Sequence, residues 1–68
     1  MSDLVLDLKG KEKWIEWSVF VYLNASGEYY ALAKVGSTVR ITSNQQKDIA
    51  ARDEGCQLVA DMFAELGI

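Results

Sequence analysis

The sequence contains no histidine, no proline and only one cysteine, Cys56. Histidine is the side chain used most often for general acid–base catalysis near neutral pH. A single thiol excludes a disulfide within the chain, and with scattered carboxylates it does not make a zinc site. No glycine-rich loop precedes a helix at the spacing that binds phosphate. We therefore expect no metal, no cofactor and no enzymatic activity.

The chain is also short, with 68 residues, and we expect a single domain over residues 1–68. A domain of this size buries only about 60% of the surface of its unfolded chain, so its stability alone is marginal. Small domains are usually stabilised by disulfides, a metal or a second subunit. Because the composition excludes the first two, we expect a homodimer.

No excess of basic residues is present, although nucleic-acid-binding domains normally show one. The net charge is −3, and it lies entirely in residues 43–68 because charges cancel in residues 1–42. No apolar run approaches the roughly 20 residues of a membrane span, and the amino terminus lacks the basic start and apolar core of a signal peptide. These features predict a cytoplasmic protein without a membrane contact, and they disfavour nucleic acid as a partner.

The most regular pattern runs from Ile15 to Leu23, where apolar residues occupy every odd position. Such alternation with β-branched and aromatic residues indicates a central strand. Residues 4–8 alternate in the same way, and a polar turn over residues 10–13 would fold them back onto the central strand. Asn24–Gly27 predicts a type I turn closed by a glycine, followed by a third strand over residues 28–35.

Residues 38–42 have two possible structures. They form either a fourth strand, with Val39 and Ile41 facing the core and Arg40 facing outward, or a continuation of the third strand through a bulge at Gly36. The expected fold class is therefore α+β: an antiparallel meander of three or four strands followed by one C-terminal helix packed on one face of the sheet.

The helix is expected from Ser43 to Leu66, because Ser43 and Gln46 fit a capping box and Gly67 is a natural C-cap. Gly55 lies inside it and either allows close packing or marks a kink. The expected core between helix and sheet consists of Val19, Val21, Ala31, Val59 and Phe63.

The apolar positions of this helix fill an arc of about 200°, wider than the stripe of somewhat over 100° that one sheet requires. The excess around Ala51, Leu58 and Met62 predicts a second contact. Arg52 also lies in this arc. Either its aliphatic stem extends along the sheet to the edge, or its guanidinium pairs with a carboxylate such as Glu16 or with a partner molecule. The opposite arc is acidic and consists of Asp53, Glu54, Gln57, Asp61 and Glu65. It serves either solubility or docking onto a basic surface.

Four aromatic side chains, Trp14, Phe20, Tyr22 and Tyr30, are expected on the sheet face away from the helix. They suit a protein interface or single-stranded nucleic acid, unless the N-terminal strand simply covers them. We favour a non-catalytic protein–protein interaction module, a homodimeric regulator or inhibitor that binds a larger protein target. The alternative is a nucleic-acid-binding module in which Trp14, Tyr22 and Tyr30 act together with the basic residues Lys11, Lys13 and Arg40. The residues predicted to bind a partner are Trp14, Phe20, Tyr22, Tyr30, Arg52, Glu54, Leu58, Asp61, Met62 and Glu65.

One family resemblance adds a further hypothesis. A strand, the turn Asn24-Ala25-Ser26-Gly27, a tyrosine-rich strand and a helix together resemble the small sheet-plus-helix domain of HicB-like antitoxins. The resemblance covers about half of the chain and implies an antitoxin-type domain. The chain departs from that family at the entry to the helix, where Thr42-Ser43-Asn44 stands in place of Gly-Asp-Thr.

Overall fold

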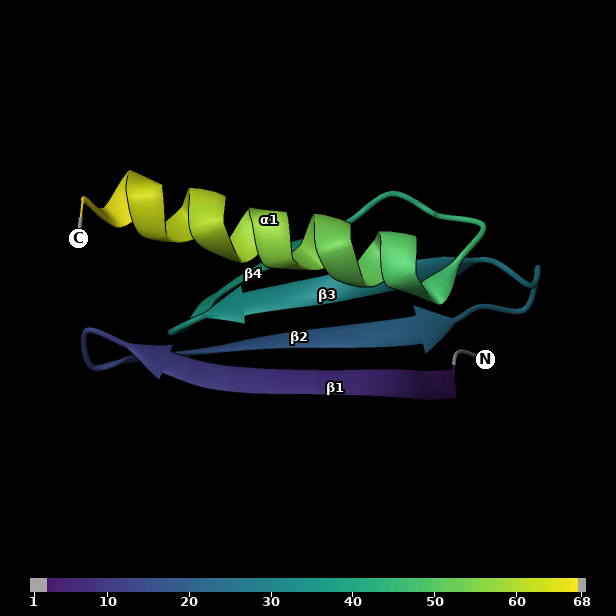
Figure 1. Cartoon of the computed structure of the whole chain (residues 1–68), viewed down its shortest axis with the longest axis horizontal. Helices are drawn as coiled ribbons and strands as arrows, with labels where there is room; N and C mark the ends of the chain where they lie inside the picture. The colour runs from purple at the N-terminus through teal and green to yellow at the C-terminus, as the bar shows by residue number, and fades with distance from the viewer. Residues whose placement is uncertain (1–2, 68) are drawn as a thin grey trace.

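The structure, a computed structural model, describes residues 3–67, and residues 1, 2 and 68 of the predicted domain lie outside that range. Four strands form one antiparallel sheet in chain order, and a single helix follows them (Figure 1). These elements are β1 (Asp3–Glu12), β2 (Ile15–Leu23), β3 (Tyr29–Val35), β4 (Thr38–Ile41) and α1 (Asp48–Leu66). The helix lies along one face of the sheet (Figure 1), which confirms the α+β class and the meander.

The predicted turn over residues 10–13 is wrong, because the β1–β2 connection is shorter. β1 continues to Glu12, and only Lys13 and Trp14 connect the strands, with φ angles of 49° and 69°. Two positive φ angles in a two-residue loop are typical of a type I′ turn, which usually has Asn-Gly at these positions. Gly10 instead lies inside β1 opposite Trp17, where a Cβ atom would come within 2.5 Å of the indole ring.

The other two turns use glycine as the sequence suggests. Asn24 accepts hydrogen bonds through its side-chain oxygen from the N–H groups of Ser26 and Glu28, at 2.9 and 3.0 Å, and Gly27 has a φ of 82°. Gly36 begins the β3–β4 turn with a φ of 59°. Because β3 and β4 pair antiparallel, the alternative of one bulged strand is excluded.

The expected orientation of β4 is wrong. A two-residue turn places Thr38 opposite Val35, which faces the helix. Side chains alternate along a strand, so Arg40 shares the helix face, whereas Val39 and Ile41 point away from the helix and are 48% and 63% exposed. Apolar side chains that were expected in the core therefore lie on the outside of the sheet.

The helix begins at Asp48, so the predicted start at Ser43 is also wrong. The Ser43 hydroxyl donates to Glu54 at 3.1 Å, and Gln45 exchanges two backbone hydrogen bonds with Tyr29 at 2.6 and 2.8 Å. These tertiary contacts hold residues 43–47 in an extended loop in place of a first helical turn. The predicted C-cap is confirmed, because Gly67 adopts the left-handed conformation with a φ of 76°.

The core lies between α1 and strands β2 and β3. All five residues expected there are buried, and Val19, Val21 and Ala31 are completely inaccessible. A Cβ atom at Gly55 would lie 2.7 Å from Val19 Cγ1 and 2.9 Å from Ala31 Cβ, so this glycine permits close helix–sheet packing. Close packing also brings the flanks of α1 onto the sheet. Ala51 and Met62 are therefore buried, at 0% and 3% exposure, and the second contact expected of them is wrong.

Candidate protein-interaction surfaces

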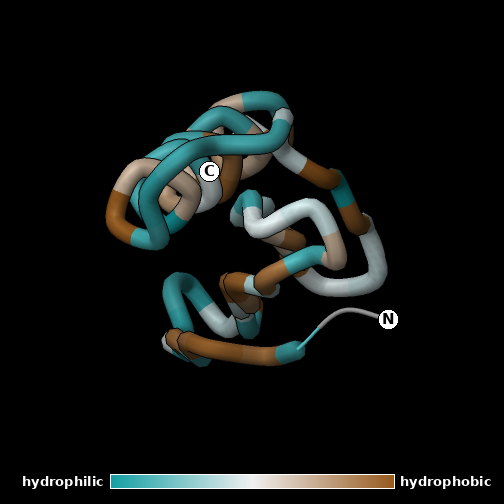
Figure 2. The backbone as a smooth tube through the Cα atoms, turned by 90° about the vertical axis from the view of Figure 1, so that its right-hand side faces the viewer, coloured by the Kyte–Doolittle hydropathy of each residue, from teal (hydrophilic) through white to brown (hydrophobic). Residues whose placement is uncertain are grey.

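The sheet face away from α1 is uncovered by any helix or strand within residues 3–67. Figure 2, which looks along the strands, shows α1 above one face and β1 at the far edge. We call the uncovered side the open face. Its apolar side chains are Leu4, Phe20, Tyr22, Tyr30, Leu32, Val39 and Ile41.

The strand register makes these side chains contiguous. Tyr22 lies between Leu4 and Tyr30, and its ring stacks on that of Tyr30 with centroids 5.4 Å apart. In the neighbouring row, Phe20 pairs with Leu32, which in turn pairs with Ile41. Leu4 and Ile41 are 52% and 63% exposed at the two sides of this patch. The open face therefore carries an apolar patch that extends across all four strands.

The other half of the open face is charged. Lys9 and Lys34 lie on either side of Ser18, and Lys11 pairs with Glu16 in the next row. A hollow of about 400 Å³ lies at this end, and its lining includes Lys11, Glu16 and Lys34. The surface thus combines an apolar patch with a polar end on which lysines predominate.

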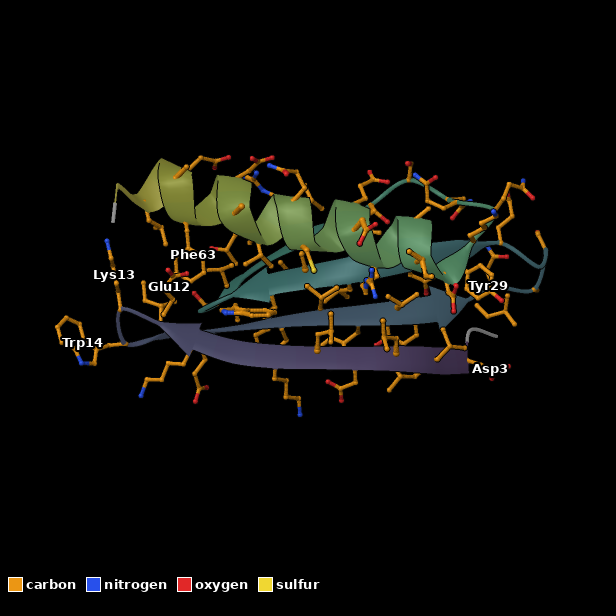
Figure 3. The ribbon with its side chains drawn as sticks, in the orientation of Figure 1. Asp3, Glu12, Lys13, Trp14, Tyr29 and Phe63 are labelled. Atoms are coloured by element: carbon orange, nitrogen blue, oxygen red, sulfur yellow. The ribbon has the colours of Figure 1, made fainter. Side chains whose placement is uncertain are left out.

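Trp14 lies at the tip of the β1–β2 hairpin and not within the sheet face. Figure 3 shows its side chain projecting beyond the end of the sheet, and it is 89% exposed. Its backbone is in the left-handed region, which costs about 1–2 kcal/mol for a residue with a side chain. Trp14 is also among the residues that line the hollow with Lys11 and Lys34.

The predicted acidic arc of the helix is engaged within the chain. The Glu54 carboxylate accepts hydrogen bonds from the Ser43 hydroxyl and from the Gln45 amide, at 3.1 and 2.6 Å. Asp61 accepts a hydrogen bond from Gln57 at 2.9 Å. Because the Glu54 contacts anchor the loop before α1, that side chain has a structural task.

Glu65 forms a bidentate ion pair with Arg40 of β4, with N–O distances of 2.5 and 2.8 Å. The hydrogen bonds and charge of the guanidinium lower the pKa of Glu65, and the same contacts raise the pKa of Arg40. Both side chains are substantially exposed, so salt screens this pair. The pair ties the last turns of α1 to the edge strand β4.

Arg52 neither crosses to Glu16 nor enters the core. Its guanidinium contacts the carboxylate of the next residue, Asp53, at 3.0 Å, and its side chain is 39% exposed. Glu16 lies on the opposite face of the sheet. The prediction of a pair between Arg52 and Glu16 is wrong, because the carboxylate that Arg52 contacts belongs to its neighbour Asp53.

A second apolar surface lies between α1 and β1. The helix contacts β3 and β2 far more than β1, and the space that remains is a groove of about 430 Å³. We call it the α1–β1 groove; it is lined by Glu12, Trp17, Cys56, Val59, Ala60, Phe63 and Ala64. Figure 3 shows Glu12 and Phe63 at its end near the hairpin tip. Leu58, which was predicted to bind a partner, is half-buried beside the core.

Sequence reasoning placed three aromatics, Phe20, Tyr22 and Tyr30, on the open face correctly. It missed the apolar residues that β1 and β4 add to the same face, which are Leu4, Val39 and Ile41. The missing signal for β4 was the length of the Gly36-Ser37 turn, because a two-residue hairpin fixes which side chains share a face.

No family model, curated protein or solved structure matches this chain, so the resemblance to HicB-like antitoxins rests on its turn and strand pattern alone. In the described part of the chain, the helix is not long and apolar enough to cross a membrane. Among the same residues, no three histidine, cysteine, aspartate or glutamate side chains are grouped so as to hold a metal ion.

Proposed function

We propose that this chain is a non-catalytic protein-interaction module, a homodimeric cytoplasmic regulator or inhibitor that binds a larger protein through its open face. The supporting observation is the apolar patch of that face, which extends across four strands without cover from residues 3–67. Monomeric soluble proteins rarely expose contiguous apolar patches of this kind, and aromatic residues are enriched where proteins meet.

The charges of the open face define the partner surface that would fit. Lys9, Lys11 and Lys34 lie beside the apolar patch, against Asp7 and Glu16. A partner with an apolar centre and acidic residues at one side would complement this arrangement. The acidic arc of α1 supports docking less well, because its carboxylates already have partners within the chain.

Two isoleucines of similar exposure provide a matched test. Ile41 is 63% exposed on the open face, and Ile49 is 56% exposed on α1. A partner isolated with the wild-type chain from the source cell should be lost with Ile41→Lys and retained with Ile49→Lys. Retention of the same partner by Ile41→Lys, with the unfolding midpoint unchanged, would contradict binding through the open face.

The nucleic-acid alternative finds one supporting feature, the hollow where Trp14 lies near Lys11 and Lys34. It loses another, because Arg40 lies on the helix side of the sheet and pairs with Glu65. Binding to a fluorescent single-stranded oligonucleotide that weakens steeply between low and physiological salt would support this alternative in place of a protein partner.

A further inference from the structure

Within residues 3–67, β1 is the first strand of the sheet and has a neighbouring strand on one side only. The Gly36 N–H donates to the Glu16 carbonyl at 2.9 Å, so the even-numbered residues of β2 bond to β3. In an antiparallel sheet the bonding direction alternates along a strand, so the odd-numbered residues of β2 bond to β1. The backbone N–H and C=O groups of their β1 partners, such as Leu8 opposite Val19, therefore point toward β2. The N–H and C=O groups of Asp7, Lys9 and Lys11 consequently point outward from the edge.

This edge is long, and the charged side chains along it, Asp7, Lys9 and Lys11, have both signs and can therefore pair with those of a second copy. Sheets usually guard their edges with proline, bulges, charges or very short strands. β1 has ten residues, and its bulge between Leu4 and Leu6 leaves residues 6–12 in regular register. The sequence contains no proline, whereas the opposite edge strand, β4, has only four residues. The β1 edge is thus the better template for another strand.

We propose that two copies of the chain pair through β1, antiparallel about a two-fold axis at Leu8, and so form a continuous eight-stranded sheet. The proposal rests on the homodimer of the proposed function and names the surface that forms it. In this register Asp7 of each copy lies opposite Lys9 of the other. Within one chain these two side chains already approach to 3.9 Å on the open face, so the dimer joins four alternating charges.

The registers at Asp7, Lys9 and Gly10 bring like charges together, and an axis at Leu6 carries the new pairing into the β1 bulge between Leu4 and Leu6. Only the odd-numbered residues of β1 direct their backbone groups outward, so odd-numbered residues of one copy must face odd-numbered residues of the other. The two-fold axis must therefore pass beside a residue and not between two residues. An axis at Asp7 or at Lys9 places that residue opposite its own copy, and an axis at Gly10 places Lys9 opposite Lys11. Like charges directly opposite on neighbouring strands destabilise a sheet. The axis at Leu8 avoids every such pair.

The side chains on the helix face also fit this axis. Leu8, which is half-buried in one chain, meets its own copy, and Leu6 lies opposite Gly10, where Trp17 covers the backbone. The additional strand borders the α1–β1 groove, whose lining is mainly apolar. Because the axis is perpendicular to the sheet, both open faces lie on the same side. The dimer therefore presents a surface twice as wide to the partner.

Cysteine cross-linking tests the axis directly. Side chains at a non-hydrogen-bonded antiparallel pair have Cα atoms about 4.5 Å apart, within the range that a disulfide spans. Leu8→Cys in a Cys56→Ser background should thus form an interchain disulfide under mild oxidation. Leu6→Cys in the same background is the matched control, because its two copies would lie about 13 Å apart and should not cross-link.

Charge exchange tests the register. Asp7→Lys or Lys9→Asp alone creates two like-charge pairs across the axis and should raise the dimer dissociation constant about tenfold or more at low salt. Combining Asp7→Lys with Lys9→Asp should restore it, because opposite charges then face each other again. Lys34→Asp, which makes the same charge change as Lys9→Asp but on β3, should leave dimerisation nearly unchanged.

Sedimentation equilibrium separates the outcomes. A dimer of the 7.6 kDa chain with the Leu8→Cys cross-link and the charge-exchange pattern supports β1 pairing. A dimer without them overturns β1 pairing but leaves the homodimer of the proposed function intact. A monomer at all concentrations up to about a hundred micromolar overturns both, whereas partner binding through the open face is judged separately by Ile41→Lys.

Discussion

Gly55→Ala tests how closely α1 approaches the sheet. Alanine is favoured over glycine inside a helix by about 1 kcal/mol, so propensity alone predicts a more stable protein. The new Cβ atom would, however, lie 2.7 Å from Val19 Cγ1 and 2.9 Å from Ala31 Cβ, whereas ordinary contacts measure 3.4–4 Å. The two effects have opposite signs, so the direction of the change is informative.

Neither neighbour can move aside cheaply. Val19 is completely buried at the centre of the sheet, and a β-branched side chain has few alternative rotamers. Ala31 Cβ is attached directly to the backbone of β3. The helix must therefore move outward, and overpacking of this kind costs about 1–3 kcal/mol. Subtracting the propensity gain leaves an expected loss of stability of about 1 kcal/mol.

Urea denaturation followed by far-UV circular dichroism measures this change, which corresponds to a fall in melting temperature of about 4–8 °C for a domain of this size. Ala60→Gly, at an exposed position of the same helix, measures the propensity difference within this protein. A Gly55→Ala variant that is more stable than the wild type, by about the amount that Ala60→Gly loses, would refute the close approach.

Three further predictions concern individual contacts. Thr42→Val removes the hydroxyl oxygen that accepts a buried N–H of β3 at 2.8 Å, and it should cost about 1–3 kcal/mol in chemical denaturation; an unchanged midpoint would contradict this. Lys13→Asn combined with Trp14→Gly relieves two left-handed residues and should stabilise the hairpin by about 1–3 kcal/mol; a fall in melting temperature would argue against a type I′ turn. The ion pair lowers the pKa of Glu65 from its ordinary value of 4.5, so the stabilisation by the pair is present above that pH and is lost as the pH falls through the lowered pKa. Glu65→Gln should therefore reduce the acid sensitivity of the melting temperature at low salt. Identical pH profiles of the variant and the wild type would contradict the pairing.

The strands could be predicted because their residues alternate over long stretches. Ile15 to Leu23 was predicted with its observed bounds, and the Asn24–Gly27 turn joins it to β3 as expected. In both cases the deciding information is local: side-chain alternation along one strand, and an asparagine and a glycine at fixed turn positions. The core residues followed, because the alternation also assigns a face to each side chain.

The helix start could not be predicted, because a distant contact decides it. Ser43 and Gln46 fit a local capping box, yet Ser43 is held by Glu54, a residue of α1 itself. Gln45 pairs with the backbone of Tyr29 and thereby continues the edge of β3. A capping pattern describes only neighbours in sequence, so it cannot reveal that a sheet edge competes for the same residues.

The uncovered apolar surface lies on the sheet and not on the helix for a related reason. The wide apolar arc of α1 suggested a second contact for the helix, but the absence of a side chain at Gly55 lets the sheet itself bury Ala51 and Met62. The apolar surface left without cover comes instead from β4, because a two-residue turn directs Val39 and Ile41 away from α1. The helix packs mainly on β3 and β2, which leaves a groove between α1 and β1 and leaves the edge of β1 uncovered. Residues 3–67 therefore leave one apolar sheet face and one strand edge uncovered, and these are the two surfaces on which our proposals rest.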